Sequence, residues 1–204
     1  PLSNEKVVTD NSRIVAAKKT IDKILKDGGT PILMSHLGRP KGNDPEFSLS
    51  HIVKDIERVL GVKVKFTNEV LGEKTTTIVK KSGPGEIVLL ENLRFCPEEK
   101  NGDLKFAEEL SKLGDSYVND AFGTAHRAHA STSIIASFFP KNKFAGELLL
   151  KEVESIHKVM NTGKKPILGI LGGAKVSSKI TIINNIIDKI DKLIIGGGMA
   201  FTFI

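Results

Sequence analysis

Cysteine, tyrosine and tryptophan are nearly absent from this sequence of 204 residues. Its single cysteine, Cys96, excludes an internal disulfide framework and fits a reducing compartment. With no tryptophan and one tyrosine, the chain can hardly build a base-stacking surface, so its net charge of +6 argues only weakly for nucleic-acid binding. No apolar run reaches the ~18 residues of a membrane span, and a secretory signal pattern is missing. We therefore expect a cytoplasmic protein that binds neither nucleic acid nor membrane.

Arginine is scarce as well, and its placement is uneven. The chain has 25 lysines but only five arginines. Arg58 lies in an ordinary amphipathic pattern, whereas Arg13 follows Asp-Asn-Ser, Arg39 lies in Ser-His-Leu-Gly-Arg-Pro, Arg94 lies in Glu-Asn-Leu-Arg-Phe, and Arg127 lies between two histidines. Planar guanidinium groups bind carboxylates and phosphates through paired hydrogen bonds, so this usage predicts recognition of an anion.

The stretch 118–131 concentrates this signal. Small residues alternate there with His126, Arg127 and His129. Small side chains leave backbone N–H groups free to face a ligand, and a guanidinium flanked by two imidazoles suits an acidic small molecule. The plainer alternative is a turn between a strand and a helix, in which an Asn or Asp side chain caps the helix and both histidines are exposed.

Short apolar runs alternate with amphipathic segments along the chain. The short, uninterrupted run 30–34 predicts a strand covered on both faces, and amphipathic segments predict helices, the first of which is capped by Asn11-Ser12 and ends at Gly28-Gly29. The expected strands are 30–34, 62–66, 86–90, 116–119, 167–171 and 192–195, and the further expected helices are 50–60, 71–81, 103–113 and 145–160. This alternation indicates an α/β fold: a doubly wound, Rossmann-like parallel sheet with helices on both faces, followed by the beginning of a second α/β domain.

Three groups of anion-binding candidates follow three of these expected strands. His36 and Arg39 come after the first strand, Arg94 comes after the third, and the fourth strand leads into the stretch 118–131. Ligands of open parallel sheets collect outside the carboxyl ends of the strands. We therefore expect these side chains to meet at one edge of the sheet.

A second glycine-rich turn follows the fifth expected strand. The run Gly172-Gly173-Ala174-Lys175-Val176-Ser177-Ser178-Lys179 would place backbone N–H groups and two ammonium groups at a helix N-terminus, which favours phosphate. Lys175 and Lys179 are expected on one helix face, and Gly196-Gly197-Gly198 would form a floor close to a flat base. The spacing fits neither a P-loop nor the dinucleotide fingerprint, and a tight strand-to-helix turn stays the alternative. Two anion sites on separate segments suggest phosphoryl transfer between two ligands.

Taken together, these motifs resemble the phosphoglycerate kinase family. The matching blocks are Ser35-His36-Leu37-Gly38-Arg39-Pro40, Glu91-Asn92-Leu93-Arg94-Phe95, the run from Asp120 to His129, the run from Gly172 to Lys179, and the run from Gly196 to Phe203. The resemblance implies a substrate domain at 1–144 that lacks its first strand, an interdomain helix at 145–163, and the incomplete start of a nucleotide-binding domain at 164–204.

The resemblance also implies an activity and its residues. The reaction would be reversible phosphoryl transfer between 1,3-bisphosphoglycerate and ADP, giving 3-phosphoglycerate and ATP in glycolysis, by a monomer that uses Mg²⁺ bound with the nucleotide and has no metal ligands of its own. Catalytic roles fall on Lys175, at the transferred phosphoryl group, and on Arg39 and Arg127, which orient the substrate. The implied substrate ligands are Arg13, His36, Leu37, Gly38, Arg39, Arg94, His126, Arg127 and His129. The implied nucleotide ligands are Ala174, Lys175, Lys179, Gly197 and Gly198.

The sequence departs from the family pattern at both ends. The family's Asp-Phe-Asn substrate loop, expected before Pro1, and most of the nucleotide domain are missing, so we expect a fragment. One alternative is a non-catalytic piece that binds an anionic metabolite. A more distant alternative is a basic nucleic-acid-binding domain, whose affinity would fall steeply with salt.

Overall fold

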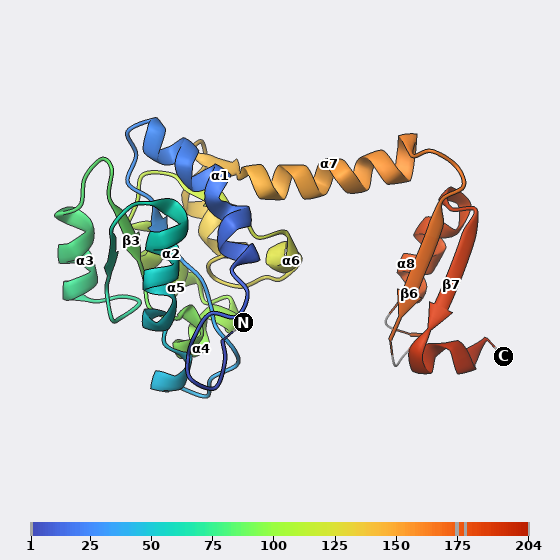
Figure 1. The fold of residues 1–204 in the computed structure, drawn as a ribbon, viewed down its shortest axis with the longest axis horizontal. Helices are drawn as coiled ribbons and strands as arrows, with labels where there is room; N and C mark the ends of the chain where they lie inside the picture. Colours follow the sequence, from blue (N-terminus) through green and yellow to red (C-terminus); the bar gives the residue numbers. More distant parts are fainter. Residues whose placement is uncertain (1, 174–175, 178, 204) are drawn as a thin grey trace. The chain divides into compact units, whose positions relative to one another are not determined.

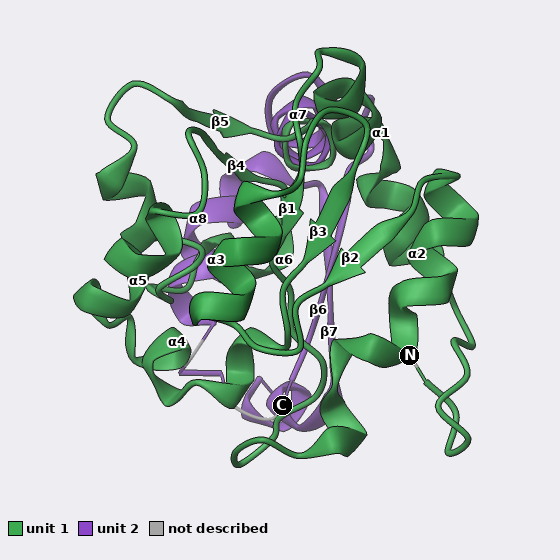
Figure 2. Ribbon diagram, turned by 90° about the vertical axis from the view of Figure 1, so that its left-hand side faces the viewer, with its two compact units in different colours: residues 1–150 green, residues 151–204 purple. Residues whose placement is uncertain are grey.

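The computed structural model describes residues 2–173, 176–177 and 179–203. The chain divides into two compact units, Pro1–Leu150 and Lys151–Ile204, which Figure 2 shows in different colours. Helix α7 (Glu147–Thr162) begins in the first unit and continues into the second. No helix in the described part of the chain combines the length and the apolar character needed to span a membrane.

Helices and strands alternate throughout the first unit (Figure 1). Its strands are β1 (Ile32–Leu33), β2 (Val64–Phe66), β3 (Ile87–Leu89), β4 (Tyr117–Asn119) and β5 (Lys143–Ala145). Its helices, before α7, are α1 (Ser12–Lys26), α2 (Val53–Leu60), α3 (Glu73–Lys80), α4 (Pro97–Asn101), α5 (Leu104–Ser111) and α6 (Phe122–Ala125). Single 3-10 turns include Leu49–Ile52, which leads into α2, and Leu93–Phe95, which follows β3.

The five strands of the first unit form two sheets, and all their strand pairs are parallel. One sheet has the order β1-β3-β2, with Ile32 opposite Val88 and Phe66 opposite Leu89, and a second sheet pairs β4 with β5. Parallel neighbours require crossover connections, and the intervening helices supply them. The predicted α/β class with parallel strands is confirmed, although the hydrogen-bonded strands of this unit form two sheets.

Central strand β3 shows why helices must cover both faces of the sheet. Side chains alternate between faces along a strand, and Ile87 and Leu89 pack with α1 and α2 in one apolar cluster. Val88 and the following Leu90 pack with α3 and α5 in the other cluster. All four side chains are at most 1% exposed. A strand buried on both faces has no polar positions, which is why 87–90 is an unbroken apolar run.

Helix ends follow local chemistry, with one exception to the prediction. Asp103 caps α5 by accepting a hydrogen bond from the backbone N–H of Phe106 (2.8 Å), and Gly61 ends α2 with a left-handed φ of 72°. At the start of α1, Asn11 occupies the N-cap position as predicted, but its side chain does not supply the cap. The Asn11 side chain makes no cap hydrogen bond among the described residues, and Asp10 Oδ1 instead accepts from the N–H of Ser12 (2.8 Å).

The second unit contains one parallel strand pair and its crossover helix. Strands β6 (Leu168–Gly172) and β7 (Lys192–Gly196) pair over five positions, and α8 (Ile180–Ile186) connects them. A 3-10 segment, Gly197–Thr202, follows β7. The predicted strands at 167–171 and 192–195 are confirmed to within one residue.

Candidate functional site

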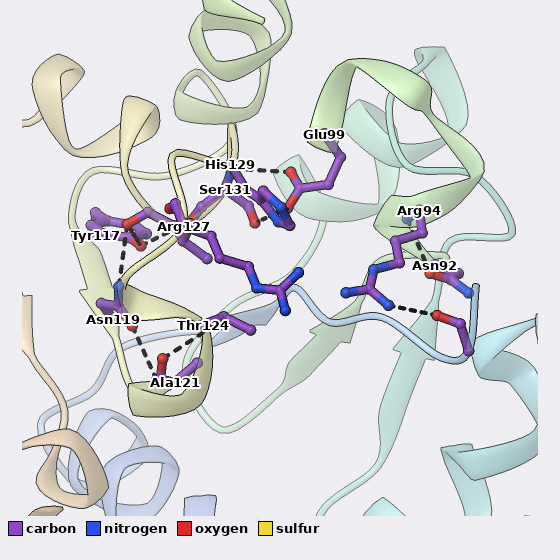
Figure 3. A network of polar contacts seen from close by, with 12 residues as sticks. Asn92, Arg94, Glu99, Tyr117, Asn119, Ala121, Thr124, Arg127, His129 and Ser131 are labelled. Atoms are coloured by element: carbon purple, nitrogen blue, oxygen red, sulfur yellow. Dashed lines mark hydrogen bonds and ion pairs between the residues drawn. The ribbon is translucent and has the colours of Figure 1, made fainter. Parts of the chain in front are cut away.

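Loops after β1, β3 and β4 bring most of the predicted anion ligands together. Their mutual electrostatic influence defines one group, here called the basic cluster: Arg13, His36, Arg39, Arg94, Arg127 and His129. Figure 3 shows the guanidinium groups of Arg94 and Arg127 pointing toward one another from different loops. This is the strand-end placement at which open α/β sheets bind ligands.

Repulsion inside the basic cluster is clearest at His36. The pKa of its imidazole is lowered to about 4: desolvation is the largest cause, and the nearby Arg94, His129, Arg13 and Arg127 side chains contribute in that order. Like charges this close cost free energy unless an anion lies among them. The cluster is therefore arranged for a ligand with more than one negative charge.

Hydrogen bonds tie the β1 loop to the β3 loop. Arg94 Nη1 donates to the carbonyl oxygen of Gly38 (2.6 Å), and the Arg94 backbone N–H donates to Asn92 Oδ1 (3.0 Å). The fully buried Asn92 donates from Nδ2 to the carbonyl oxygens of Leu37 and Phe47, both at 2.8 Å. Gly38 has a left-handed φ of 62° and lies against the Phe47 ring, so a side chain there would be strained and would collide with the ring.

Hydrogen bonds from side chains of β4 fix the segment that carries Arg127 and His129. Tyr117 Oη donates to the carbonyl oxygen of Ser131 (2.8 Å), and Asn119 Nδ2 donates to that of Thr132 (3.2 Å). Thr132 Oγ1 in turn donates to the carbonyl oxygen of Arg127 (2.9 Å). Burial raises the pKa of the Tyr117 phenol to about 12, so it remains a donor at neutral pH.

The predicted substrate ligands differ in what they contact. Leu37 and Gly38 contribute backbone carbonyls to the hydrogen bonds between loops, as described above. His129 belongs to the basic cluster, but His126 is exposed at the end of α6 and interacts with no member of the cluster among the described residues.

Two buried acidic residues near the site were not singled out from the sequence. Glu91 is 7% exposed and accepts from the N–H groups of Leu49 (2.8 Å) and Asn92 (2.7 Å). Glu99, in α4, is 4% exposed and contacts the segment that carries His129. A polar residue directly after the apolar run 87–90 was a usable signal for Glu91, whereas the run Glu98-Glu99-Lys100, typical of an exposed segment, gave no signal for Glu99.

In the second unit, the two glycine turns meet. The N–H of Met199 donates to the carbonyl oxygen of Gly173 (2.9 Å), and a Cβ on Gly197, whose φ is 71°, would lie 3.0 Å from that same oxygen. The Lys179 side chain lies against Gly173, with Cε 3.2 Å from the position of an added Cβ. This close approach accounts for the glycines.

One predicted nucleotide ligand, Lys179, lies elsewhere than expected, and two others are outside the described residues. Helix α8 begins at Ile180, so Lys179 is its N-cap and not a residue on a helix face. Ala174 and Lys175 lie outside the described residues. Gly198 lies in the 3-10 segment that follows β7.

The fold is that of an α/β protein with cationic side chains on the loops that follow parallel strands β1, β3 and β4. More specifically, the chain belongs to the phosphoglycerate kinase family, because the family model described as "Phosphoglycerate kinase" matches residues 1–204.

Individual relatives agree with this assignment. The chain is 50% identical over 198 residues to a phosphoglycerate kinase of Moorella thermoacetica, which covers 97% of this chain and 50% of the relative. It is 46% identical over 204 residues to a phosphoglycerate kinase of Aquifex aeolicus, covering 100% of this chain and 51% of the relative. The chain thus spans about half the length of the curated relatives it matches.

Solved structures agree as well. The structure of phosphoglycerate kinase from Coxiella burnetii aligns with a TM-score of 0.79 at 36% identity, covering 100% of this chain and 50% of that one. The crystal structure of phosphoglycerate kinase from Pyrococcus horikoshii OT3 aligns with a TM-score of 0.84 at 28% identity, covering 100% and 51%.

Proposed function

We propose that this chain supplies the acidic-substrate site, and the first part of the nucleotide site, of a phosphoglycerate kinase. The reaction is reversible transfer of a phosphoryl group between 1,3-bisphosphoglycerate and ADP, giving 3-phosphoglycerate and ATP. The basic cluster carries this proposal, because four arginines and two histidines from separate segments lie near enough to influence one another electrostatically. A phosphorylated carboxylic acid has the two anionic groups that such a site favours.

The proposed division of labour follows the chain. Residues 1–144 form the substrate domain, 145–163 the interdomain helix, and 164–204 the start of the nucleotide-binding domain. Ala174, Lys175, Lys179, Gly197 and Gly198 are the proposed nucleotide ligands. The protein would act as a monomer in the cytoplasm, as an enzyme of glycolysis.

Chemistry at this site requires positioning more than proton transfer. The acceptor in the direction of 1,3-bisphosphoglycerate formation is a carboxylate, whose ordinary pKa near 4 leaves it ionised at neutral pH without a general base. The protein must then hold two anions in line and neutralise the oxygens of the migrating group. Arg39 and Arg127 orient the substrate, and Lys175 stabilises the transferred phosphoryl group.

Mg²⁺ fits this scheme as a partner of the nucleotide. The ion usually keeps several waters and binds through substrate phosphates with few protein carboxylates. Among the described residues, no group of three or more His, Cys, Asp or Glu side chains is placed to hold a metal ion. When bound, Mg²⁺ would neutralise phosphate charge.

Substitution of Arg39 tests the substrate assignment. Arg39→Ala should weaken binding of 3-phosphoglycerate, measured by isothermal titration calorimetry on the complete protein, by roughly the 1.5–3 kcal/mol of a hydrogen bond to a charged group. Arg39→Lys should restore only part of this, because the planar fork is lost. Arg58→Ala, which removes an exposed arginine from α2, is the matched control. Equal affinities of the Arg39→Ala protein and the unmodified protein would refute the assignment.

A second candidate is a protein that binds the acid but transfers nothing. One observation favours it: every member of the basic cluster lies in the first compact unit, so anion binding needs no residue of the second. A coupled assay for ATP-dependent turnover, run beside the calorimetric titration, separates binding alone from catalysis. Affinity for an oligonucleotide that falls steeply with salt, unaffected by 3-phosphoglycerate, would instead favour nucleic-acid binding.

A further inference from the structure

A buried carboxylate holds the segment that carries His129. Glu99 Oε2 accepts from the backbone N–H of Ser131 (3.0 Å), and Glu99 Oε1 accepts from Ser131 Oγ (2.6 Å). The Glu99 backbone carbonyl also accepts from the N–H of Ala130 (2.9 Å). Three hydrogen bonds therefore join one residue of α4 to two consecutive residues of the segment, as part of the network in Figure 3.

The end of α4 also presses directly on this segment. Gly102 ends α4 with a left-handed φ of 65°, and a Cβ there would collide with the carbonyl oxygen of Ala128. Helix α4 thus contacts the segment immediately before His129 as well as immediately after it. The backbone on both sides of His129 is fixed by the same short helix.

The charge of Glu99 faces the basic cluster. Its Oε1 lies 3.7 Å from His129 Nδ1, close enough for an ion pair when the imidazole is protonated. Desolvation lowers the pKa of His129, the Glu99 carboxylate opposes that shift, and the charges of Arg127, Arg94 and Lys100 add to it. Arg94 also feels the negative charge of Glu99. Burial makes this charge more effective, because little water screens it.

We infer that Glu99 is a positioning residue of the anion site, which fastens residues 130–131 and serves as the negative partner of His129, so that His129 and Arg127 face the bound anion. This inference rests on the proposed function for the identity of the anion. Glu99 lies behind His129 and acts on the ligand through it. The same residue could serve folding alone, and the two roles differ in what they predict.

Two substitutions separate the hydrogen bonds of Glu99 from its charge. In Glu99→Gln, the amide oxygen can still accept from the Ser131 N–H and the amide NH₂ can donate to Ser131 Oγ, so the attachment remains while the charge is lost. Glu99→Ala removes both. Glu98→Ala is the matched control, because it removes the neighbouring acidic side chain, which is exposed.

The measurements are the dissociation constant for 3-phosphoglycerate by calorimetry and the His129 pKa by NMR titration of its imidazole, both on the complete protein. Glu99→Ala should weaken binding by about tenfold or more, since a charge-assisted attachment of the loop is lost. Glu99→Gln should keep the affinity within about threefold but lower the His129 pKa, because the opposing negative charge is gone. Glu98→Ala should change neither quantity appreciably.

Results that would contradict the role of Glu99 can be told apart from results that would contradict the proposed function. If the unmodified protein does not bind 3-phosphoglycerate, the proposed function is wrong, and the His129 titration still judges the role of Glu99. If the unmodified protein binds and Glu99→Ala binds equally well, Glu99 is not a positioning residue. Should Glu99→Ala fail to fold, an unchanged His129 pKa in Glu99→Gln overturns the inference, and a lowered one supports it.

Discussion

The depressed pKa of His36 gives the most direct test of the basic cluster. A pKa of about 4, compared with an ordinary value near 6.5, means that at pH 6 about 1% of the His36 side chains are protonated, where about three-quarters would be in an unfolded chain. Desolvation is the largest cause, and the four neighbouring cations follow. The perturbations that should move this value are a bound anion and the removal of one cation.

The sign of the stability effect can be worked out from this shift. Between pH 6.5 and about 4 the unfolded chain takes up a proton at this histidine and the folded protein does not. The stability due to neutral His36 is therefore complete above pH 6.5 and is lost as the pH falls toward 4. Comparing urea unfolding of the unmodified protein with that of His36→Gln across this range isolates the contribution, because His36→Gln should lose less stability on acidification.

An anion in the cluster should reverse the shift. Sulfate is the better probe, because it keeps two charges over this pH range, whereas a phosphate ester has a second pKa of about 6 and gains a proton within the range. Saturating sulfate should raise the His36 pKa, and the protein should consequently bind sulfate more tightly as the pH falls through this window. The NMR titration of the His36 C2 proton, with and without sulfate, measures the shift.

Arg127→Gln is the cleanest substitution for the same purpose. Within the described residues the Arg127 guanidinium makes no hydrogen bond or ion pair, so its removal takes away a charge and little else. The His36 pKa should rise by a fraction of a unit, while Arg58→Gln should leave it unchanged. A ligand-free His36 pKa near 6.5, or one that does not respond to Arg127→Gln, would refute the arrangement of charges described here.

The remaining predictions concern catalysis, helix attachment and the chain as given. In the complete protein, Lys175→Ala should lower kcat far more than it raises KM for substrate, and a change in KM alone would make Lys175 a simple binding residue. Asp120→Ala should lower the free energy of unfolding by about 0.5–2 kcal/mol, measured in urea, because Asp120 Oδ1 accepts from two N–H groups in the first turn of α7 (2.9 and 3.0 Å). An isolated polypeptide of these 204 residues should show no turnover, because positioning can supply ~7–11 kcal/mol of a barrier and these residues span about half the length of the relatives. In that polypeptide, protease should cut 164–204 sooner than 12–160, and kinase activity in a sample of verified mass would contradict the expectation.

Much of the fold could be read from the sequence because the information was local. The apolar residues 87–90 indicated a buried strand, and Gly28-Gly29 marked the end of the first helix. Strand β5 could not be found this way. All three of its residues are exposed, with no apolar run, and it is a strand because its backbone pairs with β4.

The sequence alone was enough to predict anion recognition from the arginine positions, to locate the glycine turns and to identify the family resemblance. All three depend only on residue type and spacing. Only the tertiary structure decided between His126 and His129, which lie three residues apart in the same histidine- and arginine-rich stretch. His129 faces the cluster because Glu99 reaches the neighbouring Ser131 across 32 positions of the chain, and His126 has no such contact among the described residues. Sequence patterns report which face of an element a residue occupies, but a contact of that separation exists only once α4 has packed against the segment.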